Sequence, residues 1–183
     1  GFRMESDVKA GGLNQADLTS DDMYYTKAEM KSMIQNYRKL GLDIIPEFDT
    51  PAHSLSFTKV RPDLRFGTTG RQNDHFNLST KYDESLAFIE SIWDEYIKGD
   101  DPVFDQDTTV NIGTDEYDGQ YTEQFRKFTD DLLAYIQDNG NTVRLWGSLT
   151  ARNGSTSVRS EGVQMNIWND GWANPKSMYQ QGY

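Results

Sequence analysis

Residues 108–117 read Thr108-Thr109-Val110-Asn111-Ile112-Gly113-Thr114-Asp115-Glu116-Tyr117, and this stretch decides the fold class. A β-branched run that stops at a glycine is typical of a buried strand in a parallel sheet. Side chains that follow such a strand lie at its carboxyl end, where α/β barrels and open α/β sheets carry their active sites. Asp115 and Glu116 are therefore a candidate acid pair, because neighbouring carboxyl groups repel and their pKa values separate. Adjacent Asp and Glu are also common on solvated surfaces, so this interpretation depends on the strand before them.

A second polar strand end lies upstream. The apolar run 42–49 ends in Pro46-Glu47-Phe48-Asp49, and the loop after it contains His53. Pro46 cannot donate to a ladder, so we expect strand pairing to end near it. The two nearby acids predict an Asp49–His53 pair, and a purely structural histidine remains the alternative.

The first predicted helix begins at a capping box. Thr26 and Glu29 have the spacing at which the Thr side chain accepts from a backbone amide and the Glu side chain reaches back. Apolar residues follow at helical spacing, and Gly41 is a natural end. We expect the buried face of this helix to carry Met30, Met33, Ile34, Tyr37 and Leu40.

The rest of the chain alternates between the two kinds of element. Apolar spacing predicts helices over 83–97, over 121–138 and from 175 onward, strands over 142–147 and 163–170, and loops over 9–25 and 58–80. Such alternation implies parallel β/α units joined by right-handed crossovers, hence an α/β fold.

Two of the strands end near tryptophan. Trp146 closes the strand 142–147 and Trp168 lies near the end of the strand 163–170. Each tryptophan taken singly reads as core. If all strands are parallel, however, both should lie beside the acids, and indole rings next to carboxylates are typical of a sugar site. The expected set is Asp49, His53, Asp115, Glu116, Trp146 and Trp168.

Composition limits the function classes. The chain has 183 residues, a net charge of −11 and a sequence pI near 4.5. That charge disfavours nucleic acid and anionic membrane surfaces as partners and is compatible with a neutral sugar. Cysteine is absent, which excludes disulfides and thiolate metal sites. No apolar run approaches 18 residues, so we expect no membrane insertion.

We expect no metal ion and no organic cofactor. The acidic segment Asp100, Asp101, Asp105 and Asp107 lacks the glycine and final glutamate of an EF-hand loop, so we interpret it as a solvated turn. Because residue 1 is glycine and not methionine, the chain is expected to be a processed or partial one, and a targeting segment could have been lost.

At this point the motifs resemble a known family. Residues 45–54, Ile-Pro-Glu-Phe-Asp-Thr-Pro-Ala-His-Ser, resemble the I-P-E-x-D-x-P-G-H signature of glycoside hydrolase family 20. Residues 111–116, Asn-Ile-Gly-Thr-Asp-Glu, resemble its H-I-G-G-D-E signature, in the right order and at the right spacing. The resemblance spans nearly the whole chain. Departures are Ala52 for Gly, Asn111 for His and Thr114 for the second Gly.

The resemblance implies a retaining, substrate-assisted glycosidase. Glu116 would protonate the glycosidic oxygen and later activate water. Asp115 would hold the 2-acetamido group whose oxygen attacks the anomeric carbon. Asp49 and His53 would tune Glu116 from behind it, and Trp146 and Trp168 would form walls of the sugar subsite. The substrate would be an N-acetylhexosamine-containing glycan.

The family also implies a TIM (β/α)8 barrel, of which this chain covers only the central β/α units. A full barrel needs eight strands and about 250 residues. We therefore expect residues 1–183 to be one partial catalytic domain, inactive or poorly stable alone. Because such glycans are met outside the cell, we expect an extracellular or cell-surface protein.

Four alternatives stay open from the sequence. The pocket could admit a disaccharide, as in a lacto-N-biosidase, or the chain could be a carbohydrate-binding relative without catalysis. It could also be an unrelated α/β domain with surface acids. The fourth alternative is a glycosidase that uses Asp49 or Glu47 as an enzyme nucleophile. Such an enzyme would need that carboxylate about 5 Å from the general acid.

Overall fold

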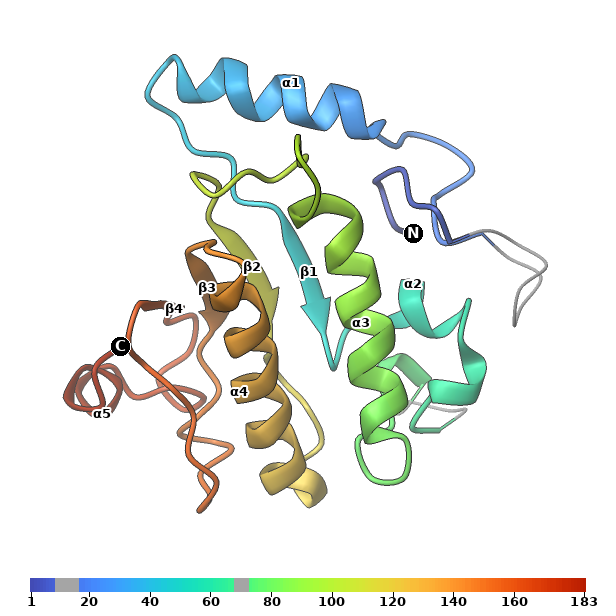
Figure 1. The fold of residues 1–183 in the computed structure, drawn as a ribbon. Coiled ribbons are helices and arrows are strands. Elements are labelled where there is room, and N and C mark those ends of the chain that lie inside the picture. Colours follow the sequence, from blue (N-terminus) through green and yellow to red (C-terminus); the bar gives the residue numbers. More distant parts are fainter. Residues whose placement is uncertain (9–16, 68–72) are drawn as a thin grey trace.

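The computed structural model describes residues 1–8, 17–67 and 73–183, and its centre is a sheet of four parallel strands. The strands lie in the order of the chain, so each crossover returns to the neighbouring position. The predicted parallel α/β fold is confirmed, and the carboxyl ends of all four strands meet at one edge of the sheet (Figure 1). The strands are β1 (Glu47–Thr50), β2 (Val110–Gly113), β3 (Val143–Trp146) and β4 (Val163–Asn166).

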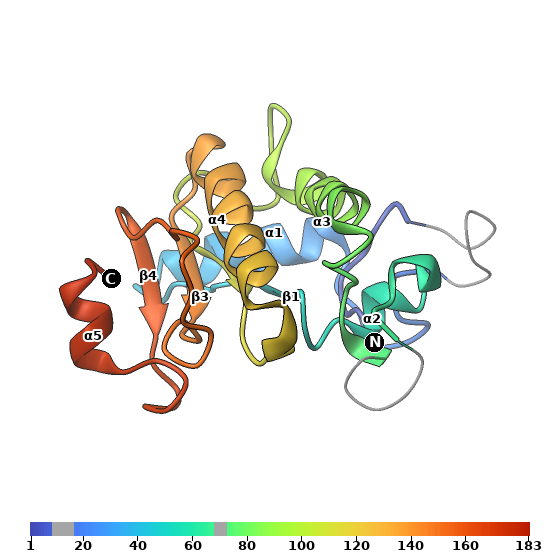
Figure 2. The same ribbon diagram turned by 90° about the horizontal axis from the view of Figure 1, so that it is seen from below.

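Two long helices cover one face of this sheet. α3 (Tyr82–Ile97) and α4 (Thr122–Asp138) lie side by side on it (Figure 2). Both match the helices expected over 83–97 and 121–138. Their apolar residues recur at helical spacing and turn inward, which buries one stripe of each helix against β2 and its neighbours. The buried apolar side chains of the two helices are Phe88, Ile89, Ile92, Trp93, Tyr96, Ile97, Phe125, Phe128, Leu132, Leu133 and Ile136.

α1 (Lys27–Arg38) begins as expected and packs differently. Thr26 Oγ1 accepts from the Glu29 amide at 3.1 Å, and Glu29 Oε2 accepts from the Thr26 amide at 2.8 Å. The predicted buried face was largely wrong, since Ile34 alone of its five residues is buried while Leu40 is 74% exposed. The reason is position: α1 lies across the end of the sheet where the strands begin and not flat on its face (Figure 1).

Two strand limits also differ from the prediction. The strand expected over 42–49 begins only at Glu47, so pairing starts after Pro46 and does not end there. The proline cannot donate, yet its carbonyl oxygen accepts from the Asn111 amide at 2.9 Å. β4 stops at Asn166, which places Trp168 in the loop beyond the strand.

The remaining elements are short. They include α2 (Leu55–Thr58), the 3-10 turns η1 (Pro62–Leu64) and η3 (Gly119–Tyr121), and α5 (Pro175–Gln180), which matches the helix expected from 175. Within the expected loop 58–80, Arg65 and Phe76 form an isolated bridge, and 68–72 lie outside the described residues. Within the expected loop 9–25, residues 9–16 also lie outside them. Among the helices that are described, none has the length and apolar character needed to cross a membrane.

The connection from β3 to β4 runs as an extended loop held by α4. The guanidinium of buried Arg126 donates to the carbonyl oxygens of Thr156 and Arg152 at 2.6 and 3.0 Å. The Glu123 carboxylate accepts from the amides of Ser155 and Thr156. Side chains of the preceding helix thus support a crossover whose backbone has few ladder partners, and they position the loop beside the carboxyl end of the sheet.

Candidate active site

A glycine brings the two acidic strand ends together. Gly113, the last residue of β2, has a φ of +77°, and a Cβ atom there would lie 1.9 Å from Oδ1 and 2.6 Å from Cα of Asp49. Such distances are impossible, so only glycine lets β1 and β2 approach this closely while its backbone adopts a left-handed turn. The turn directs the next residues, Thr114 to Glu116, over the carboxyl edge of the sheet.

Asp49 and Asp115 share this edge as a buried pair of carboxyl groups. Burial, together with the charges of Asp115 and Glu47, raises the pKa of Asp49 to about 9. Burial also raises the pKa of Asp115, while nearby His53 opposes the shift. Because two adjacent carboxylates cannot both ionise cheaply in a desolvated place, the pair favours one shared proton, and the stronger rise in pKa is at Asp49.

His53 connects the two loops that carry the acids. Its Nε2 atom lies 3.1 Å from Oε2 of Glu116 and 3.8 Å from Oδ2 of Asp115. The backbone of His53 and of Glu116 has positive φ, +54° and +48°, which few non-glycine residues adopt. Held strain of this kind is concentrated at functional sites, where surrounding structure imposes it. His53 thus contacts Glu116 and Asp115, whereas the Asp49–His53 pair predicted from the sequence is not formed among the described residues, where the two side chains are only neighbours within 4.8 Å.

Two residues behind His53 were not singled out from the sequence. Oδ2 of Asp74 lies 4.0 Å from Nδ1 of His53, on the ring edge opposite Glu116. The other oxygen of Asp74 lies 2.6 Å from Nδ1 of buried His75. The segment is tied to the His53 loop because the Ser54 amide donates to the Asp74 carbonyl at 2.8 Å. No motif marks Asp74, since its role arises from a loop that folds back.

Tyr117 anchors the acid loop. Its ring is fully buried and stacks on His75 and Phe125, with ring centres 5.0 and 5.8 Å away. Its hydroxyl donates to the Phe76 carbonyl at 2.7 Å. Because Tyr117 follows Glu116 directly, this buried attachment fixes the point at which the acid leaves the sheet. In the sequence, only the aromatic character of Tyr117 could have indicated this anchoring role.

The predicted tryptophans occupy the neighbouring strand ends. Trp146 is half-buried, and its Nε1–H donates to Oε2 of Glu47 at 3.0 Å. Trp168 is 40% exposed, and its Nε1–H donates to the carbonyl of Gly147, the residue after Trp146. The ring of Trp172 stacks on Trp168 with centres 5.7 Å apart. The two indoles thus lie near the carboxyl ends of β3 and β4, which follow β1 and β2 in the sheet.

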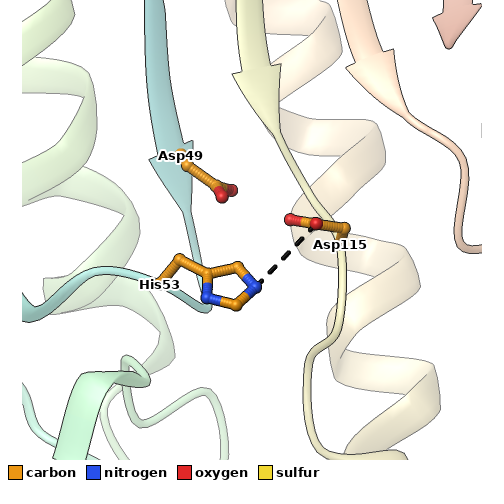
Figure 3. A group of neighbouring side chains, drawn as sticks. All are labelled: Asp49, His53 and Asp115. Atoms are coloured by element: carbon orange, nitrogen blue, oxygen red, sulfur yellow. Dashed lines mark ion pairs between the residues drawn. The ribbon is translucent and has the colours of Figure 1, made fainter. Parts of the chain in front are cut away.

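The same cluster has the composition of a cation site. Figure 3 shows Asp49 and His53 from the β1 end and Asp115 from the β2 end pointing toward one another. One ligand atom from each lies within 4.8 Å of the others, and this is the one such group found among the described residues. Metals bind the deprotonated form of a carboxyl group, so a cation here would have to displace the proton that burial favours on Asp49.

The family follows from comparison with known proteins. The model of the glycosyl hydrolase family 20 catalytic domain matches residues 2–183, almost the entire chain.

The chain belongs to glycosyl hydrolase family 20. Its sequence is 23% identical to lacto-N-biosidase of Bifidobacterium bifidum over 184 residues, which cover 87% of this chain and 16% of that protein. It is 30% identical to the human β-hexosaminidase subunit beta over 113 residues, 58% of this chain and 19% of that one. The chain therefore spans less than a fifth of the length of these two relatives.

Solved structures of family 20 share the fold. One, of the tandem catalytic modules of the pneumococcal exo-β-D-N-acetylglucosaminidase StrH, has a TM-score of 0.75 at 17% identity and covers 90% of this chain and 44% of that one. Flavobacterium johnsoniae chitobiase has a TM-score of 0.75 at 18% identity, and the match covers 100% of this chain and 30% of that one. These likenesses confirm the predicted TIM-barrel fold, of which the four parallel strands are a part.

Two departures from the family 20 signature have structural accounts. Asn111 stands in place of histidine: its Oδ1 accepts from the Gly113 amide at 2.9 Å and its Nδ2 donates to Glu47 at 2.9 Å. A histidine ring offers one acceptor and one donor nitrogen as well, so asparagine preserves that pattern. Thr114 stands in place of the second glycine at a φ of +67°, where a β-branched residue is strained.

Proposed function

We propose that the protein is a retaining exo-glycosidase that removes a β-linked N-acetylhexosamine, or a disaccharide containing it, through an oxazolinium intermediate. The observation that carries this proposal is the contact of His53 with Glu116 beside Asp115. Glu116 is the general acid that protonates the glycosidic oxygen and then the base that activates water. His53 holds the carboxyl group in place and can pass a proton to it or take one from it during the reaction.

Asp115 acts on the substrate's own acetamido group. When the acetamido oxygen attacks the anomeric carbon, the amide nitrogen becomes positive, and a nearby fixed carboxylate stabilises that charge more than the neutral ground state. In this proposal Asp49, whose pKa is raised to about 9 by burial and by the charges of Asp115 and Glu47, holds the proton of the pair, and Asp115 acts as the carboxylate. No enzyme nucleophile is needed in this scheme.

Trp146 and Trp168 provide the walls of the subsite. Their indole faces would receive the C–H surfaces of the sugar ring, and their N–H groups are already satisfied by protein acceptors. A neutral glycan is also compatible with the net charge of −11. We place the protein at the cell surface or outside the cell, because such glycans are met there.

A lacto-N-biosidase specificity is the second candidate. It is favoured by the match that extends over 87% of this chain to the protein of that name. The difference lies in whether the pocket accepts one sugar or two, and substrates of both sizes would separate the two.

The test uses the longest polypeptide in which this sequence occurs, because residues 1–183 hold four barrel strands and we expect them to be inactive alone. Aryl release would be followed from β-N-acetylglucosaminide and β-lacto-N-bioside substrates, for the wild type and for Glu116→Gln. We expect release that the substitution abolishes, and the better substrate indicates the pocket size. A folded protein that binds the sugars without release would instead be a binding relative. Turnover that resists thiazoline inhibitors, which mimic the oxazoline, would instead indicate an enzyme nucleophile.

A further inference from the structure

One carboxylate oxygen on β1 accepts hydrogen bonds from two side chains, one on each of the next two strands. Oε2 of Glu47 accepts from Nδ2 of Asn111 on β2 at 2.9 Å and from Nε1 of Trp146 on β3 at 3.0 Å. Trp146 lies 99 residues beyond Glu47 in the chain. The three side chains therefore form a polar link across three strands, on the face of the sheet that α3 and α4 do not cover.

The register explains why this link constrains the indole. Glu47 is paired in register with Asn111, and Asn111 with Arg144. Trp146 lies two residues farther along β3, so it points to the same face as Arg144. Its ring must lean back across β2 to reach Glu47. The indole has a single N–H donor, and that donor is engaged here, which fixes the ring's rotation about its side-chain bonds.

The acceptor is itself held in place. Asn111 is buried, and its Oδ1 is occupied by the Gly113 amide, so its Nδ2 is left to donate toward Glu47. Gly113 is also the residue whose close approach positions Asp49. The orientation of the Trp146 ring is thereby linked to the backbone turn that carries Asp115.

We propose that Glu47 is a positioning residue that orients the Trp146 indole as a wall of the sugar subsite. The part concerning the sugar rests on the proposed function, whereas the part concerning the ring does not. A bond from an indole N–H to a carboxylate is among the stronger hydrogen bonds in proteins, so its loss would free a large ring at the mouth of the site. Glu47 does not act on the substrate itself in this role.

The first experiment observes the ring directly. Tryptophan labelled with 15N in the indole gives one Nε1–H resonance for each side chain, and Trp146→Phe assigns the signal of Trp146. We expect Glu47→Leu to shift that signal by more than its line width. Glu47→Gln, which keeps an acceptor oxygen, should leave it near the wild-type position. Trp168 is the internal control, because its donor bonds to the Gly147 carbonyl and not to Glu47.

The second experiment measures what the ring orientation does. In the longest natural polypeptide, we expect Glu47→Leu to raise KM roughly tenfold or more, the factor that loss of one hydrogen bond to a charged group implies, with a smaller change in kcat. Glu47→Gln should restore KM to within about threefold of the wild type, because the acceptor is retained. A nucleophile replaced by Gln would instead lose kcat almost completely.

Each result decides part of the proposal. An unchanged Trp146 signal in folded Glu47→Leu would overturn it. A shifted signal with unchanged KM, in an enzyme that still depends on Glu116, would reject the positioning role and leave the proposed function standing. If the wild type has no glycosidase activity at all, the proposed function fails, and the indole signal still decides whether Glu47 holds Trp146.

Discussion

Nε2 of His53 lies 3.1 Å from Oε2 of Glu116, although 63 residues separate the two in the chain. Both residues have a backbone with positive φ, and each lies in a loop that leaves the carboxyl end of a strand, β1 for His53 and β2 for Glu116. The contact therefore exists only because the two strands are neighbours in parallel register. The following predictions test this edge of the sheet.

Replacing His53 by Asn should reduce turnover while sparing the fold. Asparagine accepts a left-handed backbone better than most residues, so the φ of +54° is tolerated. It cannot carry a proton to or from Glu116, and we expect kcat to fall about 100-fold. Aryl release across a range of pH and the melting temperature would be measured together. A kcat equal to that of the wild type would contradict the proposed role of His53.

Gly113→Ala should destabilise the protein more than its backbone angle alone explains. The new Cβ would overlap Asp49, whereas Gly41, with a nearly identical φ of +78°, has nothing within 4 Å of the same atom. Gly41→Ala therefore measures the backbone strain alone. We expect Gly113→Ala to lower the melting temperature by about 4 °C or more beyond that control. Equal losses would show that the close approach of β1 and β2 is not required.

Asp49 should make stability fall with rising pH. An unfolded Asp ionises near 3.8, whereas folded Asp49 keeps its proton up to a pKa of about 9. Between these values the unfolded state has released a proton that the folded state retains, so each unit of pH costs up to about 1.4 kcal/mol. Below pH 3.8 the effect vanishes.

Asp49→Asn should remove this dependence. Melting temperatures measured from pH 5 to pH 8 should fall less steeply for Asp49→Asn than for the wild type. Exposed Asp170→Asn serves as the control, and its curve should run parallel to that of the wild type. A wild-type slope that Asp49→Asn leaves intact would mean that another group carries the proton.

Trp172 should support Trp168 from behind. Its ring stacks on the Trp168 ring with centres 5.7 Å apart, and the Arg152 guanidinium lies 4.6 Å from the Trp172 ring centre. Removing it by Trp172→Ala should loosen Trp168 and raise KM for the sugar substrate roughly threefold to tenfold. Tyr179→Ala, at an exposed ring in α5, is the matched aromatic control and should leave KM unchanged. Similar KM values for both variants would remove Trp172 from the site.

The long helices and the parallel order were predictable because their signals are local. A stripe of apolar residues at helical spacing suffices to predict α3 and α4, and a β-branched run ending at Gly113 suffices for β2. The face of α1 was mispredicted because its spacing is equally regular, but the helix lies at an end of the sheet where little covers it. The spacing of apolar residues predicts which of them lie on one face of a helix. Whether that face is buried depends on the elements that pack against it.

The sequence by itself determined the chemical content of this edge: two strand ends carry Asp49, His53, Asp115 and Glu116, and their motifs identify the family. Only the tertiary structure decided that Asp74 lies behind His53, that Glu47 accepts from the Trp146 indole, and that burial raises the pKa of Asp49. Those relationships depend on distances between segments far apart in the chain and on the water excluded between them. Neither quantity is encoded in local spacing, because each arises only when the strands have assembled in register.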